Sequence, residues 1–461
     1  MEETWGWLSI PLGYWMVTYV IISFIFFFLA VISKKDARFF GIIAGACAIW
    51  SFLCLVVGVT GDTLWGIPQG GFMGLFQFTL SIIFIIMAFS LIYFAFDAKN
   101  NVGHKEAFYS ALLLGGITFL LGICLLISAG ILYIRDQIIT TWHDFVPFHA
   151  HLYPPPIAKF VIVVILLVFF AIGAYCLIEM KTKSFETESA QKTDKFQKTF
   201  SKLDLEISRK IYHVIIIVVL VCYLFVGQIV LDSIYQFSSF GLPADPLLPP
   251  PEVVYDNVFV VGIIDFRAGH LLIIMAVTFV FIILLTTDFI RIKKYRYYPF
   301  KMLAKIYRDK ERLVLAPHLY LTGGVLFIVI FSSGIDLWLN TPAGISAQIV
   351  AITVMVSALA DALATIIGVT KGKHHLKGGK SKKIWEGWIA GFISAFILGF
   401  LSFLALMSQY GGTIFEGIIL SLVAAIVFGL IDYFSPPISD NVLNPVLIGL
   451  TLWGVAFLFA L

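Results

Sequence analysis

Long apolar runs separated by short polar stretches recur along the whole chain. Many of them approach the roughly 20 residues that an α-helix needs to cross a bilayer. We therefore expect an all-α fold, a polytopic bundle of about twelve transmembrane helices. The runs lie at 13–33, 39–60, 72–96, 107–133, 157–180, 211–236, 268–290, 313–335, 346–370, 384–408, 412–431 and 442–460.

The composition supports a membrane protein. Hydrophobic residues make up 60% of the 461 positions and charged residues only 13%, and the mean hydropathy is +0.97. A water-soluble domain of this size needs a larger charged share to cover its surface. The lipid bilayer is therefore the expected environment.

The positions of lysine and arginine predict the orientation of the helices. If the N-terminus is outside, all but three of the 31 basic residues lie in loops on the cytosolic side; the exceptions are Arg135, Lys159 and Arg267. This distribution follows the positive-inside rule and puts both termini outside. The net charge of +3 then reflects a basic rim facing anionic lipid headgroups, and we expect no nucleic-acid partner. A prokaryotic chain would lie in the cell membrane and a eukaryotic one in the endoplasmic reticulum membrane.

The longest polar stretch, 181–210, divides the chain. We expect a transmembrane module of unknown role at 1–180, a cytosolic linker at 181–210 and a transmembrane catalytic domain at 211–461. After the linker, polar residues cluster at the cytosolic ends of the helices, so the functional site is expected there.

A basic, glycine-containing run, "KGKHHLKGGKSKKIWEG", occupies 371–387. It is not a Walker P-loop, because His374 stands where the first glycine belongs and a transmembrane helix precedes the run. Its glycine N–H groups, its lysines and the N-terminus of the next helix nevertheless suit a polyphosphate. The alternative is an ordinary basic cytosolic loop. The candidate phosphate-binding residues are Gly378, Gly379, Lys380, Lys382 and Lys383.

Asp361 interrupts an apolar helix near its expected cytosolic end. An intramembrane carboxylate costs about 2.5–3.5 kcal/mol on insertion scales and usually has a function. A carboxylate facing a lysine-rich loop suits a magnesium nucleotide, with oxygen ligands for the metal and cations for the phosphates. Asp432 and Asp440 with Asn441 offer further oxygen ligands, although Asp440 and Asn441 also fit a simple helix cap.

Together these residues resemble the CTP-dependent lipid kinases, which include dolichol (polyprenol) kinases, phytol kinases and yeast-type diacylglycerol kinase. The resemblance spans about 204–446 and does not cover 1–180. It rests on Asp361 to Ala364 with Gly368, Lys382 and Lys383 before Glu386 and Gly387, and Asp440 and Asn441 with Pro445, and upstream on Arg209 and Lys210 with His213, Asp288 with Arg291, and Arg308 with Glu311.

Three positions depart from the family pattern. Ile384 stands where serine or threonine is usual, Ala360 replaces a glycine, and Asp432 replaces a glutamate. The resemblance implies transfer of the γ-phosphate of CTP to a membrane lipid alcohol with Mg²⁺ as the cofactor, and we expect dolichol or another polyprenol as the acceptor.

The resemblance also suggests roles for individual residues. Asp361, Asp440 and Asp432 would bind magnesium, and Arg209 and Lys210 would add to the phosphate contacts. Glu386 has three possible roles: to accept a proton, to bind metal or to brace a lysine. His213 and His318 fit a general base or a packed histidine equally well, Asp288 fits substrate positioning, and Arg308 with Glu311 also fits a surface ion pair.

Other functions compete with this one. Diacylglycerol or phytol would be alternative acceptors. A CDP-lipid synthase also uses CTP and magnesium, but its usual glycine-histidine and paired-aspartate signature is absent. A transporter would also carry acidic residues within helices, yet here they gather toward one side of the membrane.

Overall fold

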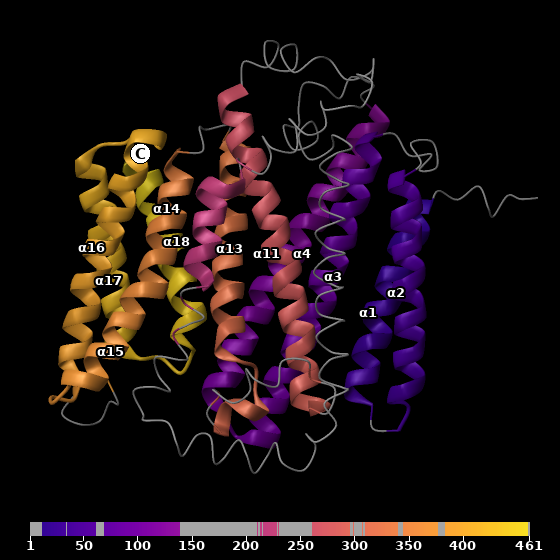
Figure 1. Ribbon diagram of the computed structural model, residues 1–461, viewed down its shortest axis with the longest axis horizontal. Helices are drawn as coiled ribbons and strands as arrows, with labels where there is room; N and C mark the ends of the chain where they lie inside the picture. The colour runs from indigo at the N-terminus through magenta and orange to yellow at the C-terminus, as the bar shows by residue number, and fades with distance from the viewer. Residues whose placement is uncertain are drawn as a thin grey trace, which may run out of the picture. The chain divides into compact units, whose positions relative to one another are not determined.

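A computed structural model describes residues 12–33, 35–60, 69–138, 210, 213, 215–227, 229, 261–295, 298, 307, 309–339, 344–376 and 383–459. Over these residues the chain is helical and contains no strand (Figure 1). Seven helices with described side chains are long and apolar enough to cross a membrane. The predicted all-α, multi-pass membrane fold is thus confirmed. The total of twelve helices stays a prediction, because span 157–180 lies outside the described residues and span 211–236 is described only in part.

The predicted spans within the described residues coincide with helices. They are α1 (Leu12–Ile32), α2 (Ala37–Thr60), α3 (Gln69–Asp97), α4 (Lys105–Ile138), α11 (Val261–Lys293), α13 (Pro317–Leu339), α14 (Gly344–Met355), α15 (Asp361–Lys371), α16 (Trp385–Tyr410), α17 (Ile414–Phe434) and α18 (Asp440–Phe459). Short helical turns lie at η1 (Ala98–Val102), η3 (Cys222–Val226), η5 (Asp309–Leu313) and η6 (Val356–Ala360). Helices dominate because hydrocarbon offers the backbone no partner, so each segment must satisfy its own hydrogen bonds.

The chain forms two compact units. The first contains 1–96, 111–172 and 293–295, and the second contains 97–110, 173–292 and 296–461. In the first unit α1 packs along α2, and Ser23 Oγ donates a 2.8 Å hydrogen bond to Ala44 O. Lys294 Nζ donates to Ser33 O, at 2.7 Å, at the end of α1.

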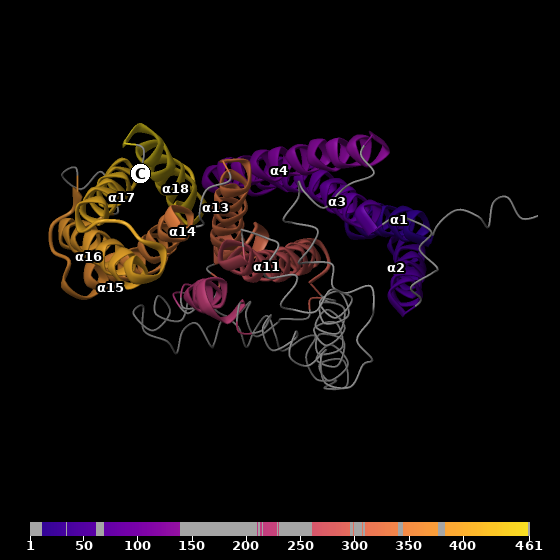
Figure 2. The same cartoon turned by 90° about the horizontal axis from the view of Figure 1, so that it is seen from above.

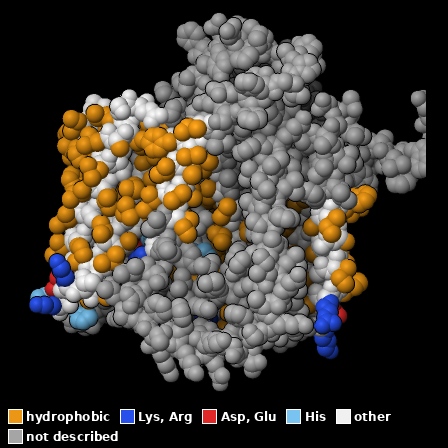
Figure 3. Space-filling view, in the orientation of Figure 1, with side chains coloured by type: hydrophobic (Ala, Val, Ile, Leu, Met, Phe, Trp, Pro, Cys, Tyr) orange, Lys and Arg blue, Asp and Glu red, His pale blue; other side chains and the backbone are white. Residues whose placement is uncertain are grey.

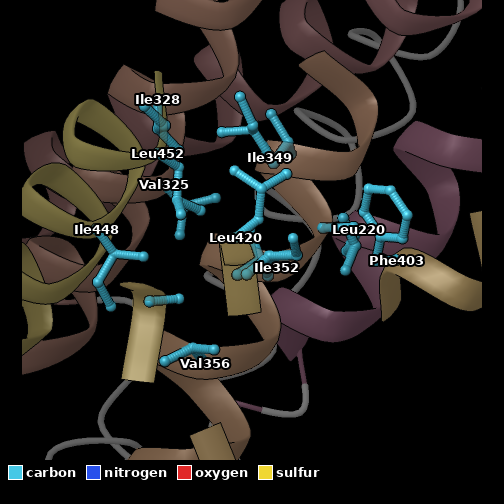
Figure 4. Packing of buried hydrophobic residues seen from close by; sticks show 14 of the residues in the cluster. Leu220, Val325, Ile328, Ile349, Ile352, Val356, Phe403, Leu420, Ile448 and Leu452 are labelled. Carbon is cyan, nitrogen blue, oxygen red and sulfur yellow. The ribbon is translucent and has the colours of Figure 1, made fainter. Parts of the chain in front are cut away.

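Helix α14 lies at the centre of the second unit, where it packs against α13, α16, α17 and α18 (Figure 2). Ile349, Val350 and Ile352 are completely buried. Figure 4 shows Ile349 and Ile352 among Leu420 of α17 and Val325 of α13, together with other apolar side chains of the core. Even its polar residues Ser346, Gln348 and Thr353 are buried, as expected for a helix inside a bundle.

Helix α16 is mostly apolar, yet its two faces differ in side-chain size. The face toward the protein carries Gly387, Gly391, Ala395, Gly399 and Phe403, and the opposite face exposes Ile389, Ile393, Ile397 and Leu401. Small residues let neighbouring backbones approach closely, and large aliphatic side chains suit lipid tails. Figure 3 shows hydrophobic side chains over this side of the second unit, with lysines and histidines gathered at one end.

Candidate functional site

A cavity of about 1190 Å³ lies within the second unit. The ends of α4, α13, α15, α16, α17 and α18 and the segment before α13 form its walls. Most of the polar residues singled out in the sequence line it, so helix ends that are distant in the chain converge on one space.

Asp361 is the first residue of α15 and follows the π-helical turn η6 directly. Such turns add a residue to the helical repeat and re-aim the side chains that follow, and they are frequent at functional sites. Asp361 is buried, with 7% of its side chain exposed. Its Oδ2 forms an ion pair with Lys210 Nζ and lies 3.2 Å from His213 Nε2. Lys210 thus neutralises the buried charge and His213 lies beside it, although the two residues are 151 and 148 positions away in the chain.

Lys383 joins two further carboxylates. Its Nζ forms an ion pair with Asp432 near the end of α17 and lies 3.5 Å from Asp440 Oδ2 at the start of α18. Burial disfavours its charge, but Asp440, Asp432 and Asp361 outweigh burial and raise the pKa of Lys383 above its ordinary value. Lys383 therefore stays charged throughout the physiological pH range.

The basic loop begins and ends at a short antiparallel neck. His375 pairs with Ile384, Leu376 N–H donates to Lys383 O at 2.9 Å, and Trp385 N–H donates to His374 O at 2.8 Å. Glu386 stands beside this neck, with Oε1 2.7 Å from His374 Nδ1 and Oε2 accepting from His374 N–H. Glu386 does not line the cavity; it braces a histidine of the neck.

Two glycines bring α15 and α16 into close contact beside the cavity. A Cβ added at Gly387 would lie 2.8 Å from Ala364 O and 3.1 Å from Gly368 Cα. Gly368 and Gly387 both line the cavity. The backbones touch here, and no larger residue fits at Gly387 without moving one helix.

Asp288 and Arg291 form a buried ion pair on α11 that holds the segment before α13. Arg291 donates to the carbonyl oxygens of Glu311, Arg312 and Val314, and Asp288 Oδ2 accepts Ala316 N–H at 2.9 Å. Asp288 lies outside the cavity lining. It orders the segment that leads to His318, which stacks with Tyr307.

The cavity brings together a large share of the predicted site residues. Those that line it are Lys210, His213, Glu311, His318, Asp361, Gly368, Lys383, Gly387, Asp432, Asp440 and Asn441. Asp288 and Glu386 are described but do not line it. Arg209, Arg308, Gly378, Gly379, Lys380 and Lys382 lie outside the described residues.

Other lining residues escaped the sequence analysis. They are His104, Glu106 and Ser110 at the start of α4, Tyr307 and Tyr320, and Ser439 before α18. For the residues around the start of α4, the available signal was that 97–105 form a polar loop expected on the same side of the membrane as the other site loops, and the others lie at helix ends where the site was expected.

The described lining contains five carboxylates and two lysines. This surplus of negative charge attracts cations, and aspartate oxygens are the ligands that Mg²⁺ prefers. Among the described side chains, no group of three or more His, Cys, Asp or Glu residues is arranged to hold a metal. The carboxylate oxygens are therefore of the type that binds a hard cation. In this structure Lys210 and Lys383 pair with three of the five carboxylates, those of Asp361, Asp432 and Asp440.

Comparisons with known proteins found no matching protein-family model, no matching curated protein and no matching solved structure.

Proposed function

We propose that this chain is a membrane phosphotransferase that moves the γ-phosphate of CTP to the hydroxyl of a membrane lipid alcohol, with dolichol or another polyprenol as the lead acceptor. One observation carries the proposal: Asp361, buried within the candidate membrane span Ile345–Lys371, contacts Lys210 and His213 in a cavity that Lys383, Asp432 and Asp440 also line. The choice of CTP rests on the sequence resemblance alone.

Phosphoryl transfer asks a protein mainly to hold the reactants in line and to neutralise charge. Lys210 and Lys383 would contact the phosphate oxygens, together with the lysines of 377–382. In this structure Lys210 pairs with Asp361, and Lys383 pairs with Asp432. The ion pairs therefore keep the lysine charges in the cavity until an anion replaces the carboxylates.

Magnesium, when bound with the nucleotide, would screen the phosphate charge and polarise the transferred group. Asp432 and Asp440 are the best-placed carboxylates for it, because both already contact one cation, Lys383. The acidic balance of the described lining supports a need for such a cation, since a bare triphosphate would meet more negative than positive side chains.

His213 would take the proton of the acceptor alcohol. Its Nε2 faces Asp361, and its buried Nδ1 has no hydrogen-bond partner among the residues that the structure describes. If Nε2–H donates to the carboxylate, Nδ1 carries the lone pair that a general base needs. The alcohol oxygen would then form a bond to the γ-phosphorus while the bond from that phosphorus to the β-γ bridging oxygen breaks. CDP would leave, with the alcohol proton on His213.

Transfer assays with γ-labelled CTP and a panel of lipid alcohols test this function in the purified full-length protein. We expect label in a prenyl phosphate, and none when Asp361 is changed to Asn. Label in phosphatidic acid alone would make diacylglycerol the acceptor. Release of pyrophosphate with a CDP-lipid would identify a synthase, and ion-coupled uptake without labelled lipid would identify a transporter. Either of the last two results would overturn the proposal.

The cytosolic position of the site is part of the proposal. Lys371 ends α15 and Lys373 stands between α15 and the neck, on the side where nucleotide must arrive. Cysteines introduced at these positions should react with an impermeant reagent only from the cytosolic side. Labelling from the opposite side would separate the cavity from its nucleotide.

A further inference from the structure

The turn between α3 and α4 belongs to the unit that contains the cavity, although it lies far upstream of the other site residues. His104, Glu106 and Ser110 of this region line the cavity. The turn is well anchored, because Gly103 adopts a left-handed conformation at φ 69° and Ala107 N–H donates to His104 Nδ1 at 3.2 Å. The turn thus forms a fixed wall of the site.

Ser110 links this wall to α18. Its hydroxyl donates to Glu106 O at 2.7 Å and accepts the backbone N–H of Ser439, also at 2.7 Å, from a residue 329 positions away. Because the hydroxyl hydrogen points at Glu106 O, the oxygen lone pairs are left for Ser439. Ser110 is completely buried and Ser439 is 6% exposed, so water does not compete for this bond.

Ser439 stands immediately before α18, and its carbonyl accepts the N–H groups of Val442 and Leu443. The next residue is Asp440, whose Oδ2 faces Lys383 Nζ at 3.5 Å. A bond that fixes Ser439 therefore fixes the backbone from which the Asp440 side chain projects.

The first turn of α18 depends on such outside support. Pro445 lies inside the helix and has no N–H for the carbonyl four residues earlier. Helix α13 presses on the same turn, since a Cβ at Gly324 would lie 2.6 Å from Pro445 Cγ and 3.2 Å from Val442 O. Contacts from α13 and from Ser110 therefore hold this turn where one helical bond is missing.

We propose that Ser110 is a positioning residue of the transferase site, which orients Asp440 toward Lys383 by holding the backbone of Ser439. The inference rests on the proposed function for its catalytic meaning. Ser110 lies outside 204–446, the part of the chain that resembles the lipid kinases.

Hydrogen–deuterium exchange of the full-length protein in detergent tests the contact itself. Ser110→Ala removes only the hydroxyl oxygen and should speed exchange at the amide of Ser439. Thr118→Val is the matched control. Thr118 lies on the same helix, is buried and bonds only to Leu114 O at 2.7 Å, so its loss should leave Ser439 unchanged. Unchanged exchange at Ser439 in Ser110→Ala would overturn the proposal.

Two further measurements separate positioning from general support. Ser110→Ala should lower the transfer rate about tenfold, the effect of one lost hydrogen bond. Added to Asp440→Asn it should lower the rate less than about twofold further, because both changes act through one carboxylate. If the rate losses of the two single variants multiply in the double variant, Ser110 only supports the fold, and the proposal fails.

The acylation rate of Lys383 gives a readout that needs no enzymatic activity. When Asp440 moves away, Lys383 should react faster with an amine reagent in Ser110→Ala, while the exposed Lys373, just before the neck, serves as the internal reference. A wild-type protein without transferase activity would defeat the proposed function, and acylation would still decide this inference. An unchanged Lys383 rate would overturn it.

Discussion

His213 Nε2 lies 3.2 Å from Asp361 Oδ2, on the carboxylate oxygen that Lys210 also contacts. The same buried oxygen of Asp361 therefore contacts both the ammonium group of Lys210 and the imidazole ring of His213 within the cavity. This relationship makes Asp361 the residue whose charge matters most for the proposed chemistry.

Asp361→Asn keeps the size of the side chain and can still accept from His213, but it removes the negative charge. We expect transfer to fall at least about 100-fold, since the lysine and the imidazole lose the charge that orients them. The substitution leaves Lys210 without its carboxylate and should lower the unfolding midpoint, but the Lys210 side chain is 16% exposed, so the protein should still fold. Initial rates with saturating CTP, together with gel filtration in detergent, measure both effects.

Lys373→Ala is the control for Asp361→Asn. Lys373 stands on the same side of the protein but does not line the cavity, so this change should leave transfer near the wild-type rate. Near-normal transfer by Asp361→Asn, with loss in Lys373→Ala, would mean that the nucleotide binds elsewhere.

Lys383 should contribute to stability in a defined pH range. Its folded-state pKa is raised by Asp440 and Asp432, so its stabilisation is present below the unfolded value of about 10.4 and is lost only as the pH rises through the raised value. The unfolding midpoints of the wild type and of Lys383→Met should therefore differ by a constant amount from about pH 7 to about pH 9.5. A difference that shrinks between pH 7 and 9 would contradict this ion-pair arrangement.

Gly387→Ala should destabilise the contact of α15 with α16. The added methyl group would meet Ala364 O at 2.8 Å, and a backbone atom cannot move aside without shifting a helix. We expect a loss of about 1–3 kcal/mol, the usual cost of overpacking, seen as a lower unfolding midpoint. Gly454→Ala on α18 is the control, because a Cβ added at Gly454 would meet no atom within 4 Å. Equal midpoints for the two variants would show that the helices are not in contact at Gly387.

Arg291→Leu should be among the most destabilising changes in the second unit. The substitution leaves Asp288 buried without its cation and removes donors from the carbonyls of Glu311, Arg312 and Val314. Breaking a buried pair in this way costs about 3–5 kcal/mol. The exposed Arg38, changed to Leu, serves as the control in thermal unfolding. A similar midpoint for both variants would remove the structural role assigned to this ion pair.

Nucleotide binding should depend on magnesium. Five carboxylates and two lysines line the described part of the cavity, so removing the metal with EDTA should weaken CTP binding at least about tenfold. Equilibrium binding at matched ionic strength, with and without Mg²⁺, measures the difference. Metal-free CTP that binds as tightly would show that the lysines alone suffice.

The sequence predicted the helices well because hydropathy reports directly on burial in lipid. It was less accurate at their ends. Span 313–335 was expected to begin before Pro317, but Arg291 and Asp288 bind the backbone of 311–316 and hold it out of α13. This interaction comes from another helix, so no local pattern contains it.

The candidate site, too, was predicted only where a local pattern reported on it. Asp361 stood out because a carboxylate is costly in an apolar helix, and its partners Lys210 and His213 were among the residues on which the predicted resemblance rested. Ser110 did not stand out, because a serine in an apolar helix usually bonds to its own backbone and carries no signal of a distant partner. Likewise, nothing in the order of residues shows that Glu386 turns toward His374 instead of the cavity.

The neck formed by His375 and Ile384 has a consequence for chain entropy. Hydrogen bonds join the backbone of 374–376 to that of 383–385. The two ends of the segment 377–382 are therefore held close together whether or not a ligand is present. The loop-closure entropy of this segment is therefore lost when the protein folds and does not have to be lost again on binding. Lengthening the loop with glycine and serine beyond the neck should weaken ligand binding only slightly, whereas replacing Leu376 with proline, which removes the N–H that donates to Lys383 O in the neck, should weaken it much more.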